Sequence, residues 1–186
     1  MRIKSALFAL LCFALATPAF ADKYTDAITN FKKAEVARPY FTSAYGYAVF
    51  PTIGKGGVGV GAAAGKGRVY QGGRYVGDST LMQLSVGFQL GGQAYSQIIF
   101  FQDKRAVDEF TNDSFEFGAD ASAVAVTLGA NAQAGTTGPS ASVSTTVENG
   151  KAITQYYKGF AVLTLAKGGL MYQAAIAGQK YVFKRK

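Results

Sequence analysis

The chain contains no histidine and no tryptophan, and its single cysteine, Cys12, lies near the N-terminus. Without histidine a Ser-His-Asp triad cannot be assembled, and a transition-metal site would depend on carboxylates alone. After residue 21, no segment supplies the roughly 18 to 20 consecutive apolar residues that a transmembrane helix needs. The sequence therefore predicts no enzyme, no cofactor and no metal site.

The N-terminus has the pattern of a secretory signal peptide. A positive n-region precedes an apolar h-region at residues 6–15 and an A-x-A cleavage site at residues 19–21. Cleavage would remove residues 1–21, with Cys12, and leave residues 22–186 as a single domain. An exported, cysteine-free chain is typical of the bacterial periplasm.

Basic residues exceed acidic ones. Nineteen Lys and Arg against eleven Asp and Glu give a formal charge of +8, and removal of Arg2 and Lys4 still leaves seventeen basic residues. This excess favours anionic partners such as lipid headgroups or nucleic acid, although it also serves as a simple solubility device. Because of the secretory signal we expect no nucleic-acid partner.

Residues 47–75 are dense in glycine. Val58 and Val60 alternate with Gly57, Gly59 and Gly61, which is the period of a strand with one face free of side chains. Such a face lets a backbone, an aromatic ring or a ligand approach closely, at a cost in local stability. We therefore interpret this segment as a shaped surface.

The same glycines are candidates for backbone contacts to an anion. Gly54, Gly56 and Gly59 have the G-x-G-x-x-G spacing of a dinucleotide turn, but the next residues alternate as in a strand and do not open a helix. We expect instead that the backbone at Gly54, Gly56, Gly57 and Gly59 allows close approach or forms an anion-binding nest.

Four basic side chains flank the glycines and are the candidate lipid-headgroup ligands: Lys55, Lys66, Arg68 and Arg74. Each basic residue near an anionic membrane is worth about 1 kcal/mol. Four on one face would give reversible, salt-sensitive attachment. Sequence alone does not show whether they share a face.

Residues 22–38 are predicted to form an amphipathic helix that ends before Pro39. The apolar stripe consists of Tyr24, Ala27, Ile28, Phe31 and Ala34. Two interpretations stay open. The stripe packs on the domain's own sheet, or Tyr24, Ile28 and Phe31 insert into a membrane, with Lys32 and Lys33 beside them.

From residue 46 the pattern is that of strands. In residues 81–90, Leu84, Val86, Phe88 and Leu90 face one way, with polar residues and glycine on the other face. Gly91-Gly92 resembles a hairpin turn into a strand at 95–101, and Asp103 looks like an N-cap for a helix with Ala106, Val107 and Phe110 on its apolar face. Further strands are expected at residues 115–128, 140–147, 152–157, 160–165, 171–176 and 180–183, with a turn at 148–150 and a loop at 129–139.

These elements predict a mainly β fold with minor α. We expect a compact antiparallel sheet, barrel-like or strongly bent, with an N-terminal helix and one or more short helices.

Four blocks of the sequence resemble the SYLF domain, a lipid-binding module. They are residues 47–70, 87–101, 115–126 and 156–172 (YAVFPTIGKGGVGVGAAAGKGRVY, GFQLGGQAYSQIIFF, FEFGADASAVAV and YYKGFAVLTLAKGGLMY). The resemblance implies a mostly β fold without known catalysis. It also implies binding of anionic phospholipids, phosphoinositides in eukaryotes, through a basic surface helped by an N-terminal amphipathic helix.

The sequence thus favours peripheral, non-catalytic binding of anionic phospholipid at the bacterial envelope, from the periplasmic side. Two alternatives remain. One is a small outer-membrane β-barrel, for which the number and length of the strands are suitable. The other is an envelope protein-interaction module whose glycine face docks a protein partner.

Overall fold

The computed structural model describes residues 22–58, 60–86, 92–118, 125–128, 147–148, 151–152, 156–167, 176 and 178–186. The expected signal peptide (1–21), Gly59 and the expected loop at 129–139 lie outside the described residues. The strands expected at 140–147 and 171–176 lie almost entirely outside them as well.

The elements of the described residues follow one another in this order: α1 (Lys23–Lys33), the 3-10 helix η1 (Glu35–Ala37), α2 (Arg38–Ser43), β1 (Gly46–Val58), β2 (Val60–Gln71), β3 (Arg74–Val86), β4 (Gln93–Phe101), α3 (Lys104–Phe110), β5 (Phe115–Glu116), β6 (Ala125–Leu128), β7 (Val147–Glu148), β8 (Lys151–Ala152), β9 (Phe160–Lys167) and β10 (Gln179–Arg185).

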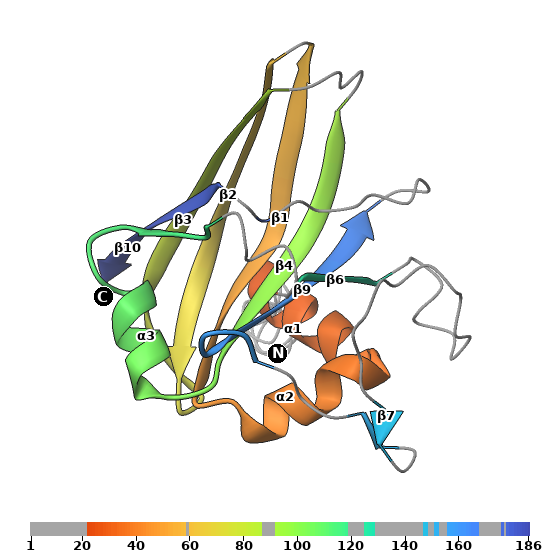
Figure 1. Ribbon diagram of the computed structural model, residues 1–186, viewed down its shortest axis with the longest axis vertical. Helices are drawn as coiled ribbons and strands as arrows, with labels where there is room; N and C mark the ends of the chain where they lie inside the picture. The colour runs from red at the N-terminus through yellow and green to blue at the C-terminus, as the bar shows by residue number, and fades with distance from the viewer. Residues whose placement is uncertain are drawn as a thin grey trace, which may run out of the picture.

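Eight strands form one curled sheet in the order β5-β10-β3-β2-β1-β4-β9-β6. Neighbouring strands run antiparallel, except that β6 is parallel to β9. Figure 1 shows the sheet as a tall half-barrel with α1 and α2 near its lower end and the β1–β2 hairpin at its upper end. The predicted fold class, a bent and mainly antiparallel sheet with an N-terminal helix and a short helix, is confirmed.

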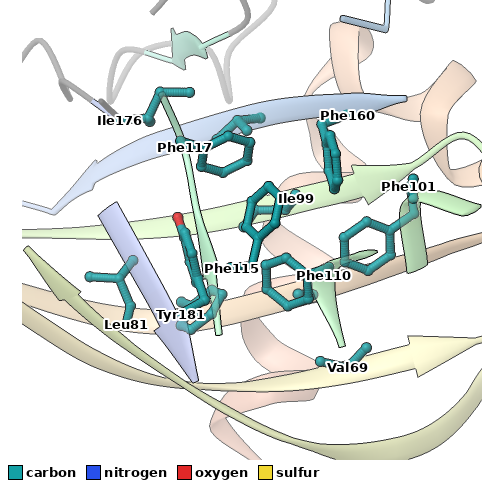
Figure 2. Close-up of a cluster of buried hydrophobic side chains, with 14 of the residues drawn as sticks. Val69, Leu81, Ile99, Phe101, Phe110, Phe115, Phe117, Phe160, Ile176 and Tyr181 are labelled. Carbon is teal, nitrogen blue, oxygen red and sulfur yellow. The ribbon is translucent and has the colours of Figure 1, made fainter. Parts of the chain in front are cut away.

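The inner face of the curl holds a core rich in aromatic residues. Phe110 of α3 lies with its ring centroid 4.9 Å from that of Phe101 and 5.1 Å from that of Tyr181. Phe115 packs against Phe160 with a centroid distance of 4.9 Å. Figure 2 shows these rings directed toward one another from α3, β4, β5, β9 and β10. Aromatic contacts at such distances add to the stabilisation from buried apolar area, so this cluster closes the lower part of the curl.

The outer face of the sheet carries α1. Tyr24 and Phe31 are buried, with Phe31 fully inaccessible to solvent, and they pack with Val49, Ile98 and Leu163 of β1, β4 and β9. The apolar stripe of the helix therefore packs on the domain's own sheet in this structure.

The predicted length of the first helix is wrong. α1 ends at Lys33, because Ala34 adopts an extended conformation with φ −74° and ψ 122°. Pro39 does not stop a helix. It stands in the first turn of α2, where its fixed φ suits the helix and its missing N–H leaves no bond unmade.

The predicted hairpin at Gly91-Gly92 is also wrong. β3 pairs with β2 and β10, whereas β4 pairs with β1 and β9. In the sheet, β2 and β1 therefore lie between β3 and β4. Two other local predictions are confirmed: Asp103 caps α3 by accepting a bond of 2.9 Å from the Ala106 N–H, and β7 pairs with β8 around the turn at 148–150.

The glycine segment forms β1 and β2, and its glycines serve two different faces. On the inner face, a Cβ at Gly67 would lie 2.6 Å from the Phe50 ring, so the ring occupies the space that a side chain would need. At the hairpin end, Gly57 has φ +154°. On the outer face, Gly54 and Gly56 have open space where a side chain would stand.

Candidate functional site

The structure does not bring the four predicted headgroup ligands together. Lys66 and Arg68 project from the outer face of β2. Lys55 projects from the inner face of β1 and is only 7% exposed. Arg74 is exposed at the opposite end of the sheet from the β1–β2 hairpin, six residues along β3 from the partner of Lys66, a distance of about 20 Å.

Arg68 is engaged with the N-terminal helix. Its Nη1 lies 2.6 Å from Asp22 Oδ2, and its guanidinium lies 4.1 Å from the centre of the Tyr24 ring. A second ring, that of Tyr75, lies 5.3 Å away. Burial raises the pKa of the Tyr24 hydroxyl, and the charge of Arg68 opposes that rise. Arg68 thus ties β2 to the first turn of α1.

Lys55 lies on the same inner face as a buried polar network, one row of the sheet away from Tyr95. Gln97 Nε2 donates to the Tyr181 hydroxyl at 2.7 Å and to Gln179 Oε1 at 3.0 Å. Gln179 Nε2 donates in turn to the Tyr95 hydroxyl at 3.0 Å. Burial raises the pKa of Tyr181 well above its usual value, so this network is neutral and holds the upper inner face together.

The candidate membrane-inserting residues of α1 also differ in their exposure to solvent. The side chains of Tyr24 and Phe31 are buried, Ile28 is half-buried, and Lys32 and Lys33 are exposed. Lys32 Nζ lies 5.4 Å from the centre of the Phe41 ring. Insertion of the apolar stripe would therefore require α1 to leave the sheet.

One row of residues crosses seven strands of the upper outer face. Its members are Lys167 (β9), Ala94 (β4), Gly54 (β1), Ala64 (β2), Met82 (β3), Lys180 (β10) and Glu116 (β5). At about 4.8 Å between strands, the row is about 24 Å wide from Lys167 to Lys180. Only small or apolar residues lie between these two lysines, and the exposed Glu116 stands beside Lys180 on the edge strand β5. Lys167 Nζ also donates to Thr52 Oγ1 at 2.8 Å.

The rows on either side continue this pattern. Toward the hairpin, Gly56, Ala62 and Leu84 lie side by side. Toward α1, Lys66 and Val182 flank Thr80. We use the name "outer tip face" for the surface formed by Gly54, Gly56, Val60, Ala62, Ala64, Lys66, Met82, Leu84, Ala94, Lys167, Lys180 and Val182.

Large apolar side chains are exposed on the outer tip face. Leu84 is 80% exposed, Val60 62%, Met82 49% and Val182 39%. The polar residue between Met82 and Leu84, Gln83, is buried instead on the inner face. The strand thus alternates as predicted, but with an apolar side turned to solvent.

Sequence reasoning missed Lys167 and Lys180. Lys184 lies opposite Asp78, in the row of Arg68. A signal was present in the sequence KYVFK, where Lys180, Val182 and Lys184 alternate with Tyr181 and Phe183. Alternation places these two lysines on one face, but only the pairing of β10 with β3 shows which residues surround them.

Arg74 lines an open hollow at the other end of the sheet, together with Tyr45, Gln71 and Val76. Among the described residues, no group of three or more acidic, histidine or cysteine side chains is placed to hold a metal ion.

The helices in the described part of the chain are all too short or too polar to cross a membrane.

A family model described as "Ysc84: Las17-binding protein actin regulator" matches residues 82–182, which is more than half of the chain. The chain belongs to the Ysc84 (SYLF) family. This confirms the resemblance seen in the sequence blocks. The match runs from Met82 to Val182 and so includes much of the outer tip face, but it does not include the glycine segment of β1 and β2. The comparison with curated proteins gave no match.

Proposed function

We propose that this Ysc84-family chain is a non-catalytic protein that binds anionic phospholipid membranes peripherally, from the periplasmic side of a bacterial envelope. The observation that carries the proposal is the outer tip face, where Lys66, Lys167 and Lys180 surround exposed apolar side chains. The signal-peptide pattern of residues 1–21 supports the location.

The electrostatics suit reversible attachment. Each lysine near an anionic surface contributes about 1 kcal/mol, so these three lysines contribute about 3 kcal/mol, or roughly 150-fold in affinity. The Debye length falls from about 10 Å at 0.1 M salt to about 3 Å at 1 M. Binding should therefore weaken strongly as salt is raised.

Sedimentation with liposomes tests the proposal. The chain, purified without detergent, should sediment with vesicles that contain anionic phospholipid, and less so at high salt. It should not sediment with zwitterionic vesicles. A chain that ignores both kinds of vesicle would contradict the proposal.

A charge-matched pair of variants locates the binding face. Lys180→Glu should lower the vesicle partition coefficient at least about tenfold, since charge reversal replaces attraction with repulsion. Arg74→Glu makes the same change in net charge at the far end of the sheet and should leave partitioning near that of the unmodified chain. Equal losses in both variants would mean that binding follows net charge and not this face.

The second candidate function is docking of a protein partner. The family description, which names Las17 binding and actin regulation, favours it. A defined partner that binds stoichiometrically without vesicles, together with no sedimentation on anionic liposomes, would support this candidate over lipid binding.

A further inference from the structure

The outer tip face exposes apolar side chains that a strand pattern would normally bury. Leu84 is 80% exposed, and its neighbours across β2 are alanine and glycine, so no larger side chain shields it. Extended apolar patches on soluble proteins mark surfaces that another molecule covers. The question is which kind of molecule fits.

The charges around the apolar side chains indicate which kind of molecule covers them. Lys167 and Lys180 bound the apolar row at its two edges, and Lys66 lies in the next row toward α1. Two acidic residues lie near the face. Glu116 pairs with Lys180 on the edge strand β5, and Asp78 lies between Arg68 and Lys184, one row further toward α1 than Lys66. Lysine stems lie along apolar surface while their ammonium groups reach a polar layer. An apolar centre with a lysine border complements anionic headgroups above an acyl interior.

The position of α1 determines which part of the outer face a membrane can reach. The helix packs on the outer face around Val49 and Ile98. Gly56 lies seven residues beyond Val49 on β1, about 20 Å closer to the hairpin end. In Figure 1 the hairpin end of β1 and β2 stands at the top of the sheet, away from α1 and α2. The first turn of α1 contacts Arg68, one row from Lys66, so a membrane meets the outer tip face at its hairpin end, beyond the helix.

We propose that the outer tip face itself enters the interfacial layer of an anionic bilayer, while α1 stays packed on the sheet. Val60 and Leu84 lie below the phosphates, and Met82 lies at the level of the phosphates with Lys66, Lys167 and Lys180. The rows of Met82, Leu84 and Val60 follow one another toward the hairpin about 7 Å apart, so the rows of Leu84 and Val60 fill the depth of about 5–10 Å that interfacial elements reach. The inference rests on the proposed function and names the surface that performs it.

The packing of α1 excludes its stripe from this role in the docked conformation. Phe31 is fully buried, and Tyr24 is buried beneath Arg68. Insertion of the stripe would expose the outer-face core, including Val49 and Ile98, to solvent. The exposed side chains at the tip need no such rearrangement.

Because the chain has no tryptophan, single-tryptophan variants report insertion directly. Leu84→Trp places the reporter on the outer tip face. Ile28→Trp places it on the stripe of α1, and Tyr45→Trp places it at the opposite end of the sheet, where Tyr45 is 40% exposed. Each variant of the full chain is mixed with anionic vesicles, with and without brominated lipid, and sedimentation is measured in parallel.

We expect the emission of Leu84→Trp to shift to shorter wavelength on vesicle binding and to be quenched by brominated lipid, with Ile28→Trp and Tyr45→Trp unchanged. Sedimentation with a shift only in Ile28→Trp would overturn the inference in favour of the helix and leave the proposed function standing. Sedimentation without an emission shift in any variant would overturn the inference in favour of purely electrostatic attachment and would also leave the proposed function standing. No sedimentation at all would overturn both.

Two further results sharpen the test. Leu84→Ser removes apolar area without changing charge and should lower the partition coefficient about tenfold, since full burial of a leucine is worth at least that factor. Urea unfolding should show that this exposed substitution leaves stability unchanged. If a second copy of the chain covered the face instead, Leu84→Trp would emit at short wavelength without vesicles, in proportion to protein concentration, and the inference would fall.

Discussion

Arg68 Nη1 lies 2.6 Å from Asp22 Oδ2, and the same guanidinium covers the ring of Tyr24, so one side chain of β2 holds the N-terminal turn of α1. Both charged side chains are partly exposed, at 34% and 42%. The ion pair is therefore worth little by itself, about 0.2–1 kcal/mol, and the ring contact adds about 0.5–1 kcal/mol.

Replacement of Arg68 tests this anchor. Arg68→Ala should lower the free energy of unfolding by about 1 kcal/mol, and Arg68→Lys should recover only part of it, because the lysine ammonium does not stack flat on a ring. Urea unfolding measures both. The control is Lys104→Ala, which removes an exposed pair with Asp108 on α3 and should cost less than 1 kcal/mol. Equal losses at the two sites would contradict the anchoring role.

Phe31 tests whether α1 is part of the folded core. Phe31→Ala should destabilise the chain by about 3–5 kcal/mol, because it removes a fully buried ring from the outer-face cluster. Thermal or urea unfolding gives the value. Thr29→Ala, on the exposed side of the same helix, serves as a control and should change stability by less than about 0.5 kcal/mol. A small effect at Phe31 would mean that the helix is not docked.

Gly67 and Gly54 form a matched pair for the two faces of the hairpin. Gly67→Ala would place a Cβ 2.6 Å from the Phe50 ring, so it should cost about 1–3 kcal/mol by overpacking. Gly54→Ala meets no atom within 4 Å and should be neutral or slightly stabilising, since alanine loses less backbone entropy on folding than glycine. Denaturant unfolding measures the change in the free energy of unfolding for both variants. Similar losses at both positions would show that the glycines serve flexibility and not close packing.

Tyr181 should make the fold sensitive to alkali. Burial raises the pKa of its hydroxyl well above the ordinary value of 10.0. The folded state therefore favours the neutral hydroxyl. The stabilisation that Tyr181 provides is complete below the pKa of this tyrosine in the unfolded chain, and it declines as the pH rises above about 10.

Tyr181→Phe separates this contribution from those of other tyrosines. Below pH 10 it should cost about 1–2 kcal/mol, because Gln97 and Gln179 each lose a hydrogen-bond partner. Above pH 10 its stability should fall less steeply than that of the unmodified chain. Unfolding free energies measured at a neutral and an alkaline pH give the two slopes. Parallel slopes would contradict a buried, neutral Tyr181.

Local features were predictable from the sequence because they depend on nearby residues. Asp103 is followed by a helical stripe, and its side chain caps α3 as expected. Glycine at every second position indicated a strand that another group approaches closely, and Phe50 fills that space at Gly67. The mainly β class and the family followed from the same local patterns.

The candidate site was less predictable, because it depends on pairing between distant strands. Lys55 and Lys66 lie eleven positions apart in one glycine segment, yet they project from opposite faces of the sheet. Lys180 reaches the site only because β10 pairs with β3, almost a hundred residues earlier in the chain.

The period of each strand, the helix caps and the glycine positions follow from backbone geometry over a few residues, so they could be predicted without knowledge of the fold. The tertiary structure alone decided which side of each strand faces solvent. Alternation is symmetric between the two faces of a sheet, and a face is chosen only when neighbouring strands and helices cover one side. Aromatic rings and a glutamine network cover the inner side of β3, so Met82 and Leu84 face outward beside Lys180.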